Sequence, residues 1–338
     1  MTLRLLLAAV LVASMGFAAH RASLCTVRAV MEVMTAGTAY MLASFAKAVL
    51  WTVVMSGSLI VVFAIDPQPV YGRLPFWAAL AGGFIFGVGA AINGGCSFST
   101  LQRLADGELG MLVSLSGMIL GFLGMSRWLS ELPGTLLQVV ATGWHWQSTW
   151  ATVLLALLWL WALWELIRLW RAHAADSGLL GRLLANRYRL SSAAAVLGIV
   201  GGTLYAVQGA WTYTNFLRSE AASWLGAGQA PAAGQALLLA ALVFGMLLSS
   251  WHRGALRLRQ PKLGELPPKL AGGLLMGIGG TLVPGGNDTL LLAAIPTFSA
   301  HAVAVFVALL AGVALTLAVM RRQMGTMPAV SCSGDRCQ

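Results

Sequence analysis

The sequence predicts an all-α integral membrane protein with about nine transmembrane helices, built as an inverted repeat whose discontinuous or re-entrant helices meet at the centre. Composition is the first indication: 58% of the 338 residues are hydrophobic and only 9% are charged, whereas soluble domains carry about 25% charged residues. The second indication is the length of the apolar runs. The third is a glycine-rich segment that occurs twice.

The apolar runs supply the predicted spans, because most of them approach the roughly 20 residues that a helix needs to cross the hydrocarbon. In chain order they cover residues 3–19, 38–65, 76–92, 111–124, 149–167, 191–211, 236–249, 270–283 and 300–319. The first run also has features of a cleavable secretory signal. Its place in the repeat described below favours an integral helix instead.

The net charge of +10 indicates topology rather than a nucleic-acid partner, because the basic residues gather between apolar runs, at residues 168–189, 253–269 and 321–322. Loops rich in Lys and Arg face the cytoplasm. We therefore expect the C-terminus and residues 20–37 inside, and the N-terminus and residues 212–233 outside.

Residues 81–101 align without gaps to residues 271–291, and five glycines coincide. A weaker match relates residues 4–16 to residues 189–201. The chain is therefore expected to form one transmembrane transport domain over residues 1–320, with repeat 1 at about 3–127, a linking helix at about 149–170 and repeat 2 at about 189–320. A single linking helix inverts the second repeat relative to the first. Residues 321–338 are expected to form a cytoplasmic tail that contains cysteines.

Each copy of the repeated segment contains a predicted helix break, at residues 93–96 in the first and at residues 284–287 in the second. Two helix N-termini would then point toward the centre, where they favour an anion. The alternative is that the glycines only allow close helix packing. The candidate substrate-binding residues around the breaks are Asn93, Gly94, Gly95, Cys96, Ser97, Gly285, Gly286, Asn287 and Asp288.

Cys25 lies between two further candidate binding residues, Arg21 and Arg28, in the sequence HRASLCTVR. On a short helix these three residues share a face, and such a face would attract an anion. Alternatively, the arginines only mark the cytoplasmic end of the first span, Arg28 pairs with Glu32, and each membrane cysteine is a small buried hydrophobe.

Asp288 is expected near the midplane, where a carboxylate needs a partner, a cavity or a proton. It could cap a half-helix or couple transport to protons or cations. The histidines and cysteines lack metal-ligand spacing, so we expect no metal and no other cofactor.

Three segments, HRASLCTVR, INGGCSFSTLQRLADGELGMLVSLSG and GGLLMGIGGTLVPGGNDTLLL, resemble the YeeE/YedE family of membrane proteins, which includes bacterial thiosulfate importers. The resemblance covers residues from about 10 to 320. It implies an inner-membrane permease that passes thiosulfate, or a related sulfur-containing anion, along intramembrane cysteines, with Cys25 and Cys96 in that role. This chain departs from the family at the second break, where thiosulfate importers have a further cysteine.

Two other readings remain open beside a permease, which would not be an enzyme. A membrane thiol–disulfide oxidoreductase could use Cys25 with Cys96 and the tail pair Cys332 with Cys337, although the chain has no Cys-x-x-Cys. A scaffold subunit would have no substrate path. For a permease, the tail cysteines could exchange sulfur with a cytoplasmic TusA-like sulfurtransferase, or they could be incidental.

Overall fold

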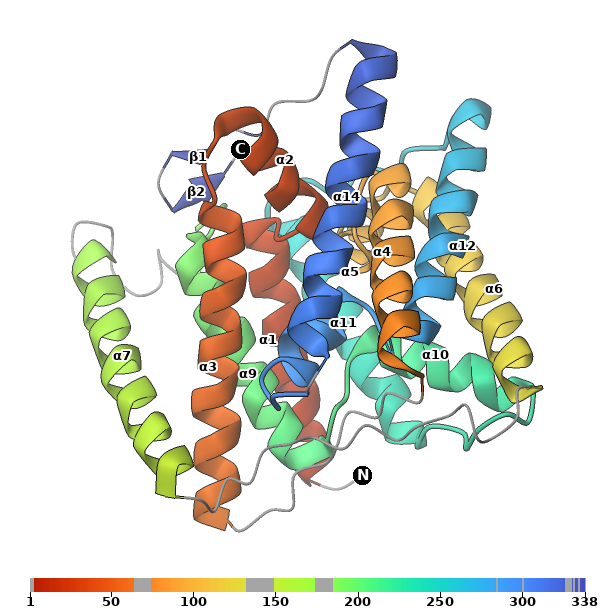
Figure 1. The fold of residues 1–338 in the computed structure, drawn as a ribbon. Coiled ribbons are helices and arrows are strands. Elements are labelled where there is room, and N and C mark those ends of the chain that lie inside the picture. Colours follow the sequence, from red (N-terminus) through yellow and green to blue (C-terminus); the bar gives the residue numbers. More distant parts are fainter. Residues whose placement is uncertain are drawn as a thin grey trace.

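The computed structural model describes residues 3–63, 74–131, 149–173, 185–283, 285–299, 301–325, 330, 332–333 and 335–337. Within these residues, eight helices are long and apolar enough to cross a membrane, and a bent helix pair raises the number to as many as nine. The prediction of an all-α membrane fold with about nine spans is confirmed. Figure 1 shows the helices side by side, with the two ends of the chain at opposite ends of the bundle.

The same order of long and short helices occurs twice. The first half comprises α1 (Leu3–Ala22), α2 (Thr26–Ala36), α3 (Tyr40–Phe63), α4 (Phe76–Asn93), α5 (Ser97–Ala105) and α6 (Gly110–Ser130). The second half comprises α9 (Leu190–Gln208), α10 (Tyr213–Trp224), α11 (Ala233–His252), α12 (Leu266–Leu282), α13 (Asn287–Thr289) with the π-turn Leu290–Ala294, and α14 (Ala302–Met324). Between them lies α7 (Thr149–His173).

Helix packing repeats with the element order. Helix α1 packs on α9 and α4 on α12, while the pair α3–α9 corresponds to α11–α1 and the pair α6–α12 to α14–α4. The equivalent helices α1 and α9 run in opposite directions, because Tyr188 N, just before α9, donates to Arg21 O at the end of α1. The two halves are therefore inverted relative to each other, as the sequence predicts.

The repeated glycines form the contact between α4 and α12. A Cβ at Gly89 would lie 2.6 Å from Gly272 O, and a Cβ at Gly279 would lie 2.5 Å from Gly82 O. Small residues let helix backbones approach closely in a membrane. These glycines are therefore packing residues, and the helix breaks lie beyond them.

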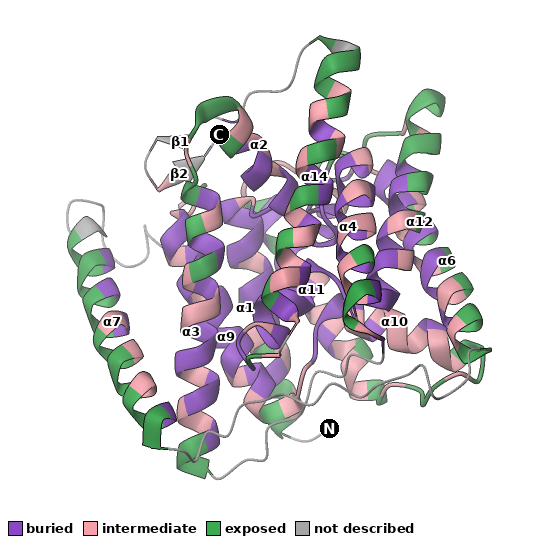
Figure 2. Cartoon of the chain, viewed as in Figure 1, coloured by how far each residue is buried: buried purple, intermediate pink, exposed green. Residues whose placement is uncertain are grey.

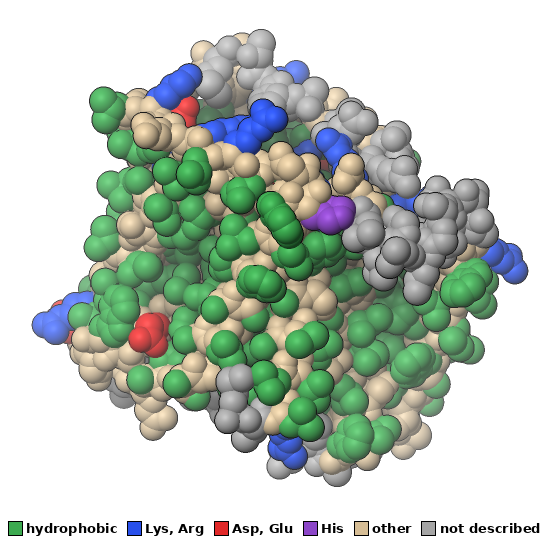
Figure 3. Space-filling model, turned by 180° about the vertical axis from the view of Figure 1, so that it is seen from behind, with side chains coloured by type: hydrophobic (Ala, Val, Ile, Leu, Met, Phe, Trp, Pro, Cys, Tyr) green, Lys and Arg blue, Asp and Glu red, His purple; other side chains and the backbone are tan. Residues whose placement is uncertain are grey.

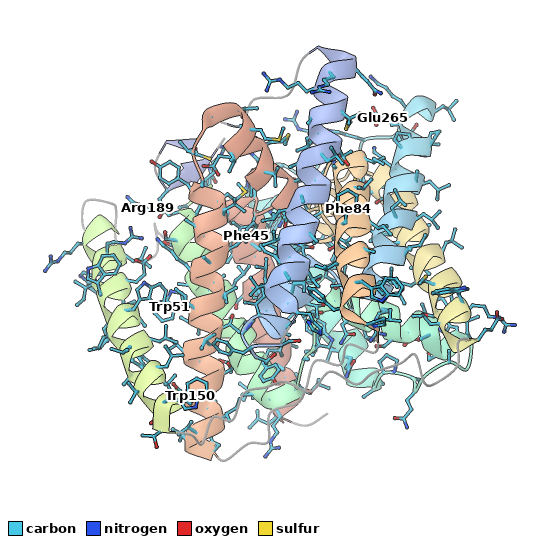
Figure 4. The ribbon with its side chains drawn as sticks, viewed as in Figure 1. Phe45, Trp51, Phe84, Trp150, Arg189 and Glu265 are labelled. Atoms are coloured by element: carbon cyan, nitrogen blue, oxygen red, sulfur yellow. The ribbon has the colours of Figure 1, made fainter. Side chains whose placement is uncertain are left out.

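Hydrophobic side chains are spread widely over the face of the bundle shown in Figure 3, as expected for a protein that faces lipid. Figure 2 shows exposed residues along the outer helices, most clearly along α7. Helix α7 is the most exposed span, with Trp150, Leu160 and Trp170 more than half exposed. Its polar attachments include the fully buried Glu165, which pairs with Lys47 of α3 at 2.9 Å, and Trp159 Nε1, which donates to Ser58 Oγ at 2.8 Å. Trp51 of α3 faces the same helix (Figure 4), with its ring 5.7 Å from the ring of Trp161.

The basic segments meet at one end of the bundle. Arg253, after α11, donates to His20 O at the end of α1, and Arg257 N donates to Asp106 O after α5. The end of the chain lies here too, as the short strands β1 (Cys332–Ser333) and β2 (Arg336–Cys337). Cys332 is disulfide-bonded, and Asp335 accepts hydrogen bonds from Ser191 N and Oγ at the start of α9. We call this the basic end; its assignment to the cytoplasm stays a prediction.

The close glycine contacts can be tested by Gly277→Ala in α12, where an added Cβ would overlap Met118 O and the backbone of α6. Such overpacking costs about 1–3 kcal/mol, so we expect a lower melting temperature in detergent. Gly124→Ala in α6 is the control, since nothing lies within 4 Å of its Cβ position. Equal melting of the two variants would contradict the packing role.

Candidate functional site

Four short helices begin close together inside the fold: α2, α5, α10 and α13. The residues at their N-cap positions are Cys25, Cys96, Thr212 and Gly286. Unpaired amide groups give a helix start a partial positive charge. Both cysteines lack a side-chain cap hydrogen bond to their own helix, so their thiols remain available for other contacts.

The backbone explains why the chain breaks at these points. Gly94 ends α4 in the left-handed conformation, with φ 75°, and its N–H bonds back to the last turn of the helix. Gly285 has φ 136°, which a residue with a side chain rarely adopts. In the first half, Ser23 takes a positive φ of 50° after α1. Pro284, part of the second predicted break, lies outside the described residues.

Polar side chains join the starts of α2, α5 and α13. Ser97 Oγ donates to Asn287 Oδ1 at 2.8 Å, and Asn287 Nδ2 donates to Thr26 Oγ1 at 3.1 Å. In the break before α5, Asn93 Nδ2 donates to Gly95 O at 2.9 Å. All of these side chains are buried. The two breaks therefore hold each other in place by direct hydrogen bonds.

A second set of contacts joins α10 to α13. Asp288 accepts hydrogen bonds from Thr214 N and from Thr214 Oγ1, and Gly286 N donates to Thr214 Oγ1 at 2.8 Å. The Asp288 carboxylate thus satisfies an amide at the start of the neighbouring half-helix α10.

The two membrane cysteines lie together at the centre, although they are far apart in sequence. Their thiols lie close to each other, and Cys25 Sγ donates to Ser99 Oγ at 3.4 Å. Cys25 is 3% exposed and Cys96 is 1% exposed, and neither is in a disulfide. We call Cys25 and Cys96 the thiol pair.

A cavity of about 160 Å³, which we call the vestibule, leads to Cys25 from the basic end. It has room for several water molecules. Cys25 and Ser99 line it together with polar and charged residues, among them His20, Arg28, Gly94, Gln102, Arg103 and Asp106. Cys96 lies behind Cys25 and does not line the vestibule.

Most charges in the vestibule are paired. Arg103 binds Glu108 at 2.7 Å, and Asp106 accepts hydrogen bonds from His20 at 3.1 Å and Ser250 at 2.7 Å. Burial disfavours the charge of Asp106, but these hydrogen bonds favour it more, so the pKa of its carboxyl lies below the usual value. Arg28 is the exception, because it has no ion pair within the described part of the chain.

Glu32 does not pair with Arg28, as one reading of the sequence suggested. Its buried carboxylate accepts hydrogen bonds from Tyr40 N at 2.8 Å and Met41 N at 2.9 Å. These amides belong to the first turn of α3, so Glu32 caps that helix.

Arg21 lies away from the vestibule, because the chain breaks between α1 and α2 and no continuous helix face joins Arg21 with Cys25. The guanidinium is buried between α1 and α11, where it donates to Ser249 Oγ at 3.2 Å and lies 2.9 Å from His252 Nδ1. It also lies 4.5 Å from the centre of the Phe17 ring. In this position Arg21 ties helices together.

Sequence reasoning missed the start of α10, because residues 212–233 were expected in an outer loop. The structure places Thr212, Tyr213 and Thr214 at the centre, beside Asp288 and Thr289. The weak repeat was the available signal. Extended past Gly201, it aligns the end of α9 with the end of α1, so a short helix equivalent to α2 is expected after α9. No cluster of His, Cys, Asp or Glu that could hold a metal occurs among the described residues.

The geometry predicts that Cys25 reacts faster than Cys96 with a small charged methanethiosulfonate reagent, because only Cys25 lines the vestibule. The experiment uses detergent-solubilised protein with Cys332→Ser and Cys337→Ser, and mass spectrometry to locate the modification. Cys25→Ser should remove the fast reaction. Faster reaction at Cys96 would show that the thiol pair is reached from the other side.

The amino-acid sequence was compared with curated proteins and with models of protein families. A search of curated proteins found no match. A family model described as sulphur transport matches residues 21–315, a range that includes the thiol pair and all four half-helix starts. Because the match spans most of the chain and agrees with the resemblance seen in the sequence, the protein belongs to the sulphur transport family, also called the YeeE/YedE family.

Proposed function

We propose that the protein is a permease of the bacterial inner membrane that imports thiosulfate, or a related sulfur-containing anion, past the thiol pair. Family membership supports a transporter of sulfur compounds. The observation that carries the finer proposal is the thiol pair itself: two free thiols close together at adjacent helix starts, next to a vestibule lined by Arg28.

The chemistry of the pair fits an anion that must both bind and leave. Thiol S–H groups are weak donors, and the amides at the starts of α2 and α5 add partial positive charge without a fixed ion. No full charge neutralises the anion at this point. A path for conduction needs such moderate binding, because a tightly held ion would not move on.

The basic residues at one end of the bundle assign the two sides of the proposed path. If the basic end faces the cytoplasm, the vestibule is the inner exit, and Arg28 draws the anion away from Cys25. A TusA-like sulfurtransferase could then receive sulfur at this end. The tail lies at this end, where Asp335 accepts a hydrogen bond from Ser191. Cys332 is disulfide-bonded, so it would have to be reduced before it could exchange sulfur.

The second half contributes polar groups where importers of the family have a cysteine. Asn287 lies between Ser97 and Thr26, with both ends of its amide engaged. In our proposal the amide exchanges one of these partners for the passing anion. Asp288, bound to Thr214, keeps the start of α10 in register with the path.

A membrane thiol–disulfide oxidoreductase is the second candidate, and the contact between Cys25 and Cys96 favours it. Such an enzyme would form and break a Cys25–Cys96 disulfide during turnover. Mass spectrometry after rapid thiol trapping distinguishes the two, because a permease keeps both thiols reduced while it transports.

We expect Cys96→Ala to slow uptake of labelled thiosulfate into proteoliposomes by about tenfold or more, which corresponds to about 1.4 kcal/mol of lost stabilisation along the path. Cys96→Ser tests whether any small donor suffices. The control is Cys332→Ser, in the tail, which should leave uptake unchanged. Wild-type uptake in Cys96→Ala would remove the thiol pair from the path.

A further inference from the structure

A second, much smaller cavity lies on the side of Cys96 away from the vestibule. We call it the closed cavity; its volume is about 10 Å³, which is room for about one water molecule. Its lining includes Phe98 of α5, Asp288 of α13, and Trp211, Thr212 and Tyr213 at the start of α10. The vestibule has room for a small anion in this structure, whereas the closed cavity does not.

Two hydrogen-bond donors in the wall of the closed cavity have no partner. Trp211 Nε1 and Tyr213 Oη are fully enclosed but make no hydrogen bond, and the two residues are 7% and 1% exposed. The Ser97 hydroxyl lies near Tyr213 but donates to Asn287, and Tyr213 Oη has no hydrogen-bond partner. A buried unsatisfied donor costs about 1–3 kcal/mol and is rare in folded proteins.

The backbone places these donors on the same side of the chain. Thr212 between them is extended, with φ −141° and ψ 156°, and residues two apart on an extended chain point in the same direction. The Tyr213 ring also packs 6.2 Å from the ring of Phe98, in the half-helix that begins at Cys96. Trp211 and Tyr213 therefore form a matched pair of donors next to the thiol pair.

An ordinary packing defect would not produce this pairing. Trp51 Nε1 is also buried without a partner, but it is a single donor that faces α7 (Figure 4). At the closed cavity, two donors from alternate residues meet beside the helix starts that line the proposed path.

The charges around the closed cavity define the kind of ligand. Lys and Arg are absent from its described lining, and the one charged group is Asp288, whose oxygens already accept from Thr214. The free groups are thus one N–H and one O–H, which suit the acceptor oxygens of a small anion. The nearby carboxylate keeps such binding weak, as transit requires.

We propose that Trp211 Nε1 and Tyr213 Oη form a binding station for a small sulfur oxyanion, on the side of the thiol pair opposite the vestibule. The station rests on the proposed function, because an anion bound there would move next to the thiol pair. It opens when the start of α10 moves away from α5, and the oxyanion then satisfies both donors.

The test replaces each donor while keeping an aromatic ring, as Trp211→Phe and Tyr213→Phe, and measures initial rates of labelled thiosulfate uptake in proteoliposomes. We expect each variant to raise KM for thiosulfate about tenfold or more, as expected for losing a hydrogen bond to a charged group. Trp51→Phe and Tyr40→Phe make the same chemical changes elsewhere, and both should keep the wild-type KM.

Thermal unfolding in detergent separates this role from a structural one. Since neither donor has a partner, Trp211→Phe and Tyr213→Phe should melt at or above the wild-type temperature while KM rises. A lower melting temperature with unchanged KM would overturn the station and show a packing role. An unchanged KM with equal or higher melting temperature would also overturn it, and would leave a buried water as the occupant of the cavity.

Failure of the station and failure of the proposed function give different results. If the thiol path is correct and the station is not, Cys96→Ala is slow while both donor variants retain the wild-type KM. If the proposed function is wrong, Cys96→Ala transports like the wild-type protein, or the wild-type protein takes up no thiosulfate.

Discussion

Backbone amides and carbonyls inside a lipid bilayer must be satisfied by the protein itself, because the hydrocarbon offers no water. This protein breaks four helices near its centre, and each break exposes such groups. Side chains satisfy some of these groups, since Gly286 N donates to Thr214 Oγ1 and Thr214 N donates to Asp288. Ser97 donates to Asn287, which in turn donates to Thr26, so side chains also join the starts of α2, α5 and α13. They tie the starts of α2, α5, α10 and α13 into one unit, and the thiol pair and both cavities are arranged around it.

The glycine contacts make this arrangement possible. Helices α4 and α12 touch through Gly82, Gly89, Gly272 and Gly279, so their backbones lie closer than larger residues would allow. Each of these helices leads directly into a break. Close packing of α4 on α12 therefore brings the first break beside the second, where their side chains can meet.

The scaffold is symmetric but its chemistry is not. Exchange of the two halves relates the N-cap thiols Cys25 and Cys96 to Thr212 and Gly286. The first half thus supplies two sulfur atoms, and the second supplies hydroxyl and amide groups with the carboxylate of Asp288. An anion that followed the proposed path would meet different ligands on the two sides, with the charged vestibule on one and neutral donors on the other.

The sequence by itself determined the membrane class, the inverted repeat and the two glycine-containing breaks, because apolar length and glycine spacing are local properties of the chain. It also marked Cys25, Cys96 and Asn287 as candidates, although not their contacts. Only the tertiary structure decided that Cys25 meets Cys96, that Arg21 ties helices together while Arg28 lines the vestibule, and that Tyr213 lies at the centre. Those outcomes depend on how distant helices pack and where α1 and α9 end, and no local pattern in the sequence encodes that packing.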